Sequence, residues 1–323
     1  MRIALVLTPP TEHHFRLAAQ VGADDFVARY QSVDTFEKMQ HTQTVAAGFG
    51  LKLSVVEGYL PMGEIIRGTE KRDAQIEEVK TVIQNMGRLK IPLLCYNWMQ
   101  SDWTRTCFEK PERGGALTNG FDITQLAGKS LPEAERLSSA QMWENLEYFL
   151  SRVLPVAEAE GIQLAMHPDD PPLPELLGAS QIMYQPESFE KLFEMFPNPA
   201  NGMCFCQGSF VEMGAEMGVD IPSTIRRFGD RIRYVHFRDV RGNASRFVET
   251  FHDNGPTDMY AAMRAYKEIG FAGTMRPDHV PLMDGEEGRA DGYSMLGRLF
   301  AVGYMRGLMH AVAREEEYSD YGN

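Results

Sequence analysis

The sequence has few cysteines, no excess of basic residues and no long apolar run, and each shortage excludes a class of protein. Four cysteines in 323 residues are far too few for a disulfide-stabilised scaffold, so a cysteine with a special role would be a metal ligand or a nucleophile. Lys and Arg total 32 against 45 Asp and Glu, a net charge of −13 that disfavours a phosphate backbone as partner. We therefore expect no nucleic-acid partner.

Membrane and secretory signals are also missing. No segment approaches the roughly 18 consecutive apolar residues of a transmembrane helix, so we expect no membrane partner. The opening run Met-Arg-Ile-Ala-Leu-Val-Leu-Thr-Pro-Pro turns too early for the apolar stretch of a secretory signal. These features indicate a globular cytoplasmic protein.

Eight short runs typical of buried β-strands recur along the chain, and helical patterns separate them. The runs cover residues 2–8, 25–30, 51–56, 91–96, 161–167, 202–206, 232–238 and 272–276. The clearest helical patterns cover residues 70–88, 138–160 and about 289–314. This alternation, with no break in composition, predicts an α/β fold: a single (β/α)₈ TIM barrel forming one domain over residues 1–323.

Three strand-to-helix connections are too long to be simple turns. They cover about 97–136, 168–186 and 239–256, and in a TIM barrel such loops lie on the catalytic face, at the carboxyl ends of the strands. The acidic tail 315–323 reads as a solvated terminus.

Reactive residues follow four consecutive predicted strands. His167, Cys206, His236 and Asp278 each stand at or just beyond a strand end, where the side chains of a barrel converge. Two imidazoles, a thiolate and a carboxylate suit a divalent transition metal, Mn²⁺, Fe²⁺, Co²⁺ or Zn²⁺, better than Mg²⁺ or Ca²⁺. We therefore predict that these four residues bind such an ion, although each alone would read as a core residue.

Groups suited to an anionic substrate lie close by in the sequence. Arg276 precedes Asp278 by two residues, Arg238 follows His236 by two, and His279 and Tyr293 come after the last strand. Arginines bind carboxylates, whereas His and Tyr can transfer protons.

The loop after the fourth strand supplies further candidates for substrate binding. The segment YNWMQSDWTRT contains Asn97, Trp98 and Arg105, which could close over a polar ligand and exclude water. His252 lies in another long loop and is a further candidate.

Taken together, these segments resemble the mannonate dehydratase family of xylose-isomerase-like barrels. The matching segments are YNWM–DWTRT, MHPDDPP, FCQGS, VHFRDV, FH followed by DMYAAMRA, and RPDH followed fourteen residues later by Tyr293. They occur in order from about residue 70 to 310.

The resemblance implies a specific reaction and specific roles. It implies a metal, typically Mn²⁺, on the same four residues, with Arg276, His279 and Tyr293 as the catalytic groups. The implied reaction is the dehydration of D-mannonate to 2-keto-3-deoxy-D-gluconate in hexuronate catabolism. Tyr293 and His279 would act as base and acid, and the sequence does not decide which is which. A homo-oligomer is compatible with the sequence, which does not fix the oligomeric state.

Two departures from the family pattern concern the pocket wall. Members usually carry Leu-His-His at the end of the second strand, where this chain reads Ala-Arg-Tyr-Gln over residues 28–31, and Val280 replaces a glycine. We expect Tyr30 to face the pocket and contact the substrate, so that a sugar acid other than D-mannonate could be preferred.

Three other functions fit a metal site on such a barrel. A sugar or sugar-acid isomerase or epimerase would use the same ion without releasing water. A metal-dependent endonuclease is disfavoured by the net charge of −13. A metal-binding protein without activity is disfavoured by the set Arg276, His279 and Tyr293.

The predicted thiolate ligand can be tested directly. We expect Cys206→Ser to weaken metal binding by roughly tenfold or more while preserving the fold, because a hydroxyl of similar volume replaces a soft ligand. Metal analysis of the purified variant measures the effect, and unchanged occupancy would contradict the four-ligand site.

Overall fold

The computed structural model describes residues 1–29, 36–58, 60–101 and 105–319, and its centre is a closed barrel of parallel strands. The strands are β1 Arg2–Val6, β2 Asp25–Ala28, β3 Lys52–Glu57, β4 Leu93–Tyr96, β7 Gln163–Met166, β10 Asn201–Cys206, β11 Ile232–Phe237 and β14 Thr274–Pro277. They close in the order β1-β14-β11-β10-β7-β4-β3-β2. The predicted (β/α)₈ barrel is confirmed, and the predicted strand ends differ from the observed ends by at most two residues.

The barrel interior is a packed core. It contains small or branched aliphatic residues and cysteines from facing strands, with Tyr234 as the one aromatic side chain of the cluster: Ala4, Val6, Val27, Val55, Leu93, Cys95, Ala165, Cys204 and Tyr234. β-branched and small residues fill the tapering inside of such a barrel. The interior is therefore closed below the level at which the strands end.

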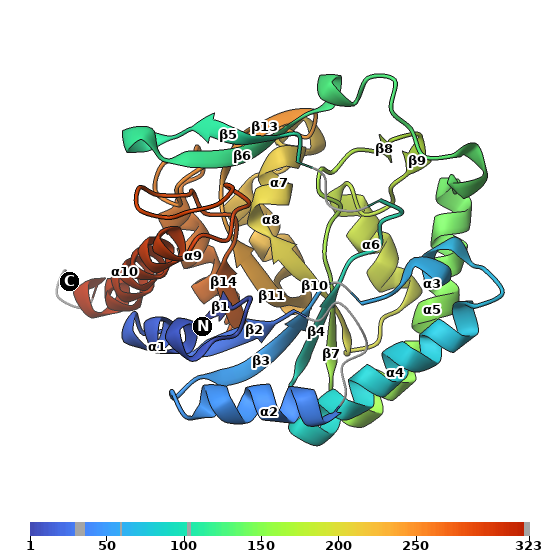
Figure 1. The fold of residues 1–323 in the computed structure, drawn as a ribbon, viewed down its shortest axis with the longest axis horizontal. Coiled ribbons are helices and arrows are strands. Elements are labelled where there is room, and N and C mark those ends of the chain that lie inside the picture. Colours follow the sequence, from blue (N-terminus) through green and yellow to red (C-terminus); the bar gives the residue numbers. More distant parts are fainter. Residues whose placement is uncertain (30–35, 59, 102–104, 320–323) are drawn as a thin grey trace.

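Helices surround the barrel (Figure 1). They are α1 Glu12–Gln20, α2 Phe36–Ala47, α3 Gly63–Arg67, α4 Arg72–Leu89, α5 Ser139–Glu160, α6 Pro186–Met195, α7 Gln207–Met213, α8 Ile221–Phe228, α9 Met259–Glu268 and α10 Met295–Ser319. Short 3₁₀ turns lie at Arg113–Gly115, Ile123–Leu126, Glu133–Glu135, Ala215–Met217 and Gly229–Arg231. None of the described helices is long and apolar enough to span a bilayer.

Helix α5 shows how local sequence sets a boundary. Ser138 and Gln141 form a reciprocal capping box at its start, which satisfies backbone N–H groups that have no partner within the helix. Gly161 ends the helix with φ 69°, a left-handed conformation that favours glycine. The stripe that includes Met142, Leu146 and Phe149 is buried against the barrel, as its spacing predicts.

The three long loops do lie at the carboxyl ends of the strands, and two of them pair with each other. β5 Cys107–Pro111 and β6 Leu117–Asp122 come from the first loop, and β12 Val240–Asn243 and β13 Arg246–Glu249 from the third. They form an antiparallel sheet in the order β12-β13-β6-β5, here called the loop sheet. Figure 1 shows it along the upper edge, far from α2 and α4. The second loop contains the hairpin of β8 Glu175–Leu176 and β9 Ala179–Ser180.

The predicted start of the last helix, about residue 289, is wrong. The helix begins at Met295 because Gly292 has φ 96°, which is incompatible with a right-handed helix. Asp291 accepts a hydrogen bond from the backbone N–H of Tyr293 at 2.9 Å and so stabilises the turn before it. Tyr293 therefore lies on a loop at the mouth of the barrel.

Candidate active site

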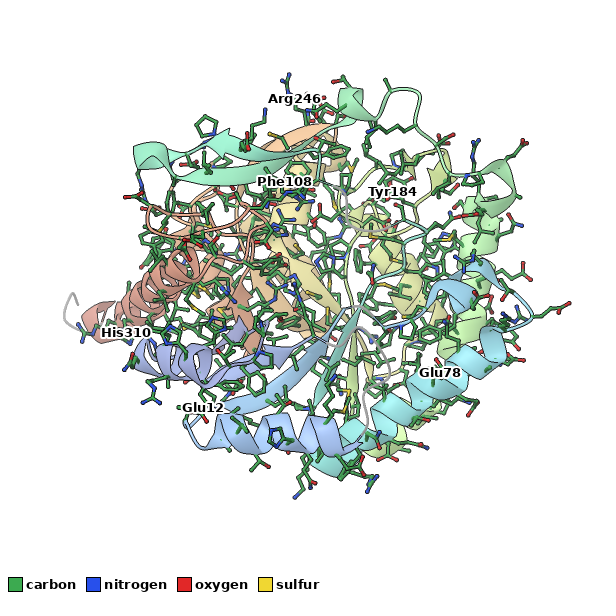
Figure 2. All side chains as sticks on the ribbon, viewed as in Figure 1. Glu12, Glu78, Phe108, Tyr184, Arg246 and His310 are labelled. Atoms are coloured by element: carbon green, nitrogen blue, oxygen red, sulfur yellow. The ribbon has the colours of Figure 1, made fainter. Side chains whose placement is uncertain are left out.

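A cavity of about 780 Å³ opens at the carboxyl ends of the barrel strands. Phe108 of β5, labelled in Figure 2, lines it from the loop sheet. The other lining residues are Val6, Thr8, Arg29, Lys38, Glu57, Gly58, Cys95, Tyr96, Asn97, Arg105, His167, His236, Arg276, Asp278, His279, Asp291, Tyr293 and Arg298. TIM barrels carry their reactive groups at this position.

Two imidazoles face each other at the edge of this cavity. Nε2 of His167 lies 3.1 Å from Nδ1 of His236. His167 Nδ1 lies 2.6 Å from the Pro168 carbonyl, which can only accept a hydrogen bond, so that Nδ1 carries the proton and Nε2 a lone pair. His236 Nε2 lies 3.2 Å from a Glu57 oxygen, which accepts a hydrogen bond in the same way, so that Nε2 carries the proton of His236 and Nδ1 its lone pair. Two lone pairs thus point at each other, an arrangement that a cation would stabilise.

A thiol and a carboxylate complete the group. Cys206 lies with His167 and His236 in a cluster whose ligand atoms are all within 4.8 Å of one another. Asp278 Oδ2 lies 3.6 Å from His236 Nδ1. Burial opposes ionisation of Cys206, but the charge of Arg238 and the contact with His236 outweigh it and lower the pKa of the thiol. The four residues predicted as metal ligands are therefore brought together, and their chemistry fits a divalent transition metal.

A second sulfur pair lies one layer deeper in the barrel. Cys95 and Cys204 lie within 4.8 Å of each other and of His236. Burial raises the pKa of Cys95, and it raises that of Cys204 well above its usual value. Since the thiolate is the form that binds a metal, Cys206 is the better ligand.

Glu57, the last residue of β3, connects the metal group to the catalytic candidates. Its side chain is almost fully buried, and it accepts hydrogen bonds from both Nε and Nη2 of Arg276 at 2.8 Å. It also accepts hydrogen bonds from the Tyr234 hydroxyl at 2.8 Å and from Nη2 of Arg29 at 2.7 Å. Burial opposes its charge, but Arg276, Arg29 and His236 hold the pKa of Glu57 well below its usual value. One carboxylate thus orients two arginines and the imidazole of His236, a predicted metal ligand.

Arg276 is itself placed between two carboxylates. Its Nη1 donates to Asp278 Oδ1 at 2.6 Å, opposite the paired contacts with Glu57. Burial opposes ionisation of Asp278, but neighbouring cations, above all Arg276, hold its pKa well below its usual value. The carboxylate is therefore ionised, as a metal ligand must be.

Tyr293 lies within reach of this group. Its hydroxyl donates to Asp278 Oδ1 at 3.1 Å and accepts Nη2 of Arg29 at 2.6 Å. The Arg29 guanidinium also lies 4.2 Å from the centre of the phenol ring. Burial raises the pKa of Tyr293, and the charges of Arg29 and Arg276 oppose that rise. The pKa of Tyr293 therefore stays above its usual value, and the two arginines limit the rise.

His279 also lines the cavity. Its ring centre lies 5.5 Å from that of Tyr293. Asn119 of β6 lies with its amide nitrogen 3.4 Å from His279 Nδ1, and its oxygen accepts Nε of Arg105 at 3.1 Å. His279 has φ 39°, uncommon for a residue with a side chain. Gly292 packs on the ring, because a Cβ there would lie 2.5 Å from Nδ1.

Of the residues predicted to bind substrate, Asn97 and Arg105 line the cavity. Arg105 reaches it while pairing with Asp170 and Glu249, each at 2.8 Å. The prediction for Tyr30 lies outside the described residues.

The structure does not bring Trp98, Arg238 or His252 to the cavity. Trp98 is fully buried, donates to the Met142 carbonyl at 3.2 Å and stacks on Phe149. His252 Nε2 contacts the Phe237 carbonyl at 2.7 Å. Both side chains are held by the core, so their contacts are structural.

Arg238 belongs to a buried cluster of charges beneath the loops. It pairs with Asp170 at 2.9 Å, Glu249 at 2.8 Å and Glu212 at 3.0 Å. Burial raises the pKa of Glu249 to about 7, although Arg238 and Arg105 counteract it. The cluster joins the three long loops to α7, because its members come from all four segments.

Glu57 and Arg29 are the functional candidates that sequence reasoning missed. Both follow the rule that located the metal ligands, since each stands at the carboxyl end of a barrel strand. The predicted third strand stopped at residue 56, one residue before Glu57. Arg29 lies in the segment 28–31, of which only Tyr30 was predicted to contact the substrate.

Sequence comparisons find relatives along nearly the whole chain. A family model described as D-mannonate dehydratase (UxuA) matches residues 20–319. The mannonate dehydratase of Oceanobacillus iheyensis is 36% identical over 291 residues, covering 81% of this chain and 82% of that protein. The mannonate dehydratase of Thermotoga maritima is 33% identical over 314 residues, with 86% of each chain covered.

Solved structures agree with this match. A mannonate dehydratase from Streptococcus suis superposes with a TM-score of 0.89 at 29% identity, covering 97% of this chain and 95% of that one. A D-psicose 3-epimerase from Clostridium cellulolyticum superposes with a TM-score of 0.61 at 12% identity, covering 97% of this chain and 99% of that one, which shows the shared fold alone.

The central position of Glu57 leads to a mutational prediction. We expect Glu57→Gln to weaken metal binding by roughly 10–100-fold, because the amide cannot accept from all the donors that surround the carboxylate. Titration with Co²⁺, followed by its visible absorption, measures this without reference to activity. Glu77→Gln, which removes an exposed carboxylate paired with Lys80, serves as the control. Equal Co²⁺ affinity in Glu57→Gln and the parent would show that the carboxylate does not orient the site.

Proposed function

Because the chain belongs to the D-mannonate dehydratase family, and is therefore a hydro-lyase, we propose that it converts D-mannonate to 2-keto-3-deoxy-D-gluconate and water. The observation that carries the proposal is the pair of opposed lone pairs on His167 and His236, with Cys206 and Asp278 beside them. This arrangement fits a resident divalent ion, for which we propose Mn²⁺.

The ion, when bound by His167, Cys206, His236 and Asp278, would act as a Lewis acid toward an oxygen of the substrate. The protein must supply the rest of the chemistry. Removing a proton beside a carboxylate leaves a dianion, so cationic side chains at the reaction centre are needed. Arg276, locked by Glu57 and Asp278, provides a fixed positive charge there.

Tyr293 and His279 transfer the two protons. One accepts the proton from the carbon beside the carboxylate, and the other gives a proton to the hydroxyl that leaves as water. Their ring centres are 5.5 Å apart, so they could flank a bound ligand. Arg29 stabilises a phenolate on Tyr293 through its 2.6 Å contact with the hydroxyl. Burial lowers the pKa of His279 well below its usual value, so the ring is neutral until it takes up a proton.

The loop sheet limits the access of water. Phe108 and Asn97 line the cavity above the strands, and Arg105 ties this wall to the buried charges of Asp170 and Glu249. A wall that keeps water away from part of the cavity strengthens the electrostatic interactions there.

The proposal is tested by incubating the Mn²⁺-loaded protein with D-mannonate, its epimers and shorter sugar acids. We expect a 2-keto-3-deoxy acid with the loss of one water, measured by mass spectrometry and as an α-keto hydrazone. Conversion without a change in mass would indicate an epimerase or isomerase instead. A better substrate than D-mannonate among the epimers would show that the departures from the family pattern at residues 28–31 alter the choice of acid.

Tyr293→Phe is the matched variant for this assay. We expect it to lower kcat by roughly 10²–10⁴ while metal content stays the same, because one proton-transfer group is lost and all four predicted metal ligands remain. A kcat within about threefold of the parent would assign proton transfer to His279 and another group.

A further inference from the structure

The cations that line the cavity differ in how they are neutralised. Arg29 pairs with Glu57 at 2.7 Å, and Arg276 pairs with both Glu57 and Asp278. Arg105 pairs with Asp170 and Glu249 in the same way. Each of these guanidinium groups therefore meets a carboxylate of the protein.

Arg298, in the first turn of α10, is held without a carboxylate. Its Nη1 donates to the Val6 carbonyl, and its Nε lies 3.3 Å from the Ser294 carbonyl. Among the described residues no carboxylate lies within 4 Å of it, and its Nη2 forms no hydrogen bond. Nη2 therefore keeps some solvent exposure, and Arg298 is one of the residues that line the cavity.

The lack of a carboxylate partner makes the charge of Arg298 unfavourable. Arg298 is only 5% exposed, and a buried charge without a counter-ion is unfavourable. Burial lowers the pKa of Arg298 to about 10, although Tyr293 and Asp291 counteract it. The pKa values of Arg29, Arg105 and Arg276 are raised instead. An anion bound from the cavity would raise the pKa of Arg298, as the carboxylates of the protein do for the other three arginines.

The position of Arg298 sets it apart from the metal ligands. Its anchor, Val6, ends β1, and β1 lies four strands from β7 in either direction around the closed barrel. His167 directly follows β7, so Arg298 and His167 stand on opposite sides of the mouth. Tyr293 is the nearest proton-transfer group in sequence and interacts with Arg298 electrostatically.

We propose that Arg298 binds the carboxylate of the sugar acid through Nη2 and the remaining N–H of Nη1, and so selects acids over uncharged sugars. The proposal rests on the function proposed above and adds to it the orientation of the substrate. With the carboxylate on Arg298, the adjacent carbon lies on the side of Tyr293, and the hydroxyls beyond it extend toward the metal ligands. A carboxylate in bidentate contact with a buried guanidinium forms strong, charge-assisted hydrogen bonds.

Binding of a matched pair of ligands tests this independently of turnover. D-gluconate and D-glucitol differ in whether the first carbon carries a carboxylate, and calorimetry on the metal-loaded protein gives both affinities. We expect the parent to prefer D-gluconate by roughly 10²-fold and Arg298→Gln to lose this preference while D-glucitol binding is unchanged. Arg306→Gln, two turns further along α10 and paired with Asp24, is the control that should keep it.

Kinetics with D-mannonate provide the second measurement. We expect Arg298→Gln to lower kcat/KM by roughly 10²–10³, mostly through KM, and Arg298→Lys to lower it less. Added guanidinium ions should restore part of the activity of Arg298→Ala, which a purely structural role of the side chain would not allow. If Arg298→Gln fails to fold, Arg298→Lys carries the same comparison of the ligand pair.

The outcomes separate this proposal from the proposed function. If the parent dehydrates no sugar acid, the proposed function fails, and the ligand pair still decides the role of Arg298. If D-mannonate is dehydrated but Arg298→Gln keeps both the acid preference and KM within threefold of the parent, the carboxylate binds elsewhere and the proposal is overturned.

Discussion

The buried carboxylate of Glu57 is the interaction on which the rest of the site depends. It faces donors from three other strand ends, namely Arg29, Arg276 and His236, together with the hydroxyl of Tyr234. Removing any one contact would leave a charge or a polar group unsatisfied in a region almost closed to water. Because these donors come from different strands, the closed barrel must form before the carboxylate is satisfied. The fold and the orientation of the reactive groups are therefore specified by the same contacts.

The site above Glu57 has two walls of different character. One wall carries the imidazoles of His167 and His236 with the thiol of Cys206, and it offers lone pairs to a cation. The other wall, at the ends of β1 and β2, carries Arg29, which is paired with Glu57, and Arg298, which offers positive charge to an anion. A polyhydroxy acid has matching ends, since its hydroxyls can bind a metal and its carboxylate a guanidinium. The chemistry of the pocket and that of the proposed substrate thus agree along the length of the molecule.

Residues that act through their position on a strand could be predicted from the sequence, and residues that act through a distant partner could not. The strand pattern placed His167, Cys206, His236 and Asp278 together, because parallel strands end at one level. Arg238 follows the same rule, yet three carboxylates from separate loops draw it into the protein. The role of a charged side chain depends on such partners, and local sequence does not reveal them.

The most direct test is the anomalous scattering of a crystal soaked in Mn²⁺ and D-gluconate. The expected result is a single peak bonded to His167 Nε2, Cys206, His236 Nδ1 and Asp278 at about 2.0–2.4 Å, with the Glu57 contacts preserved. A peak in the deeper layer beside Cys95 and Cys204 would contradict the assignment. So would an ion bound through His236 Nε2 with Glu57 displaced, since the proton positions inferred for both imidazoles would then be wrong.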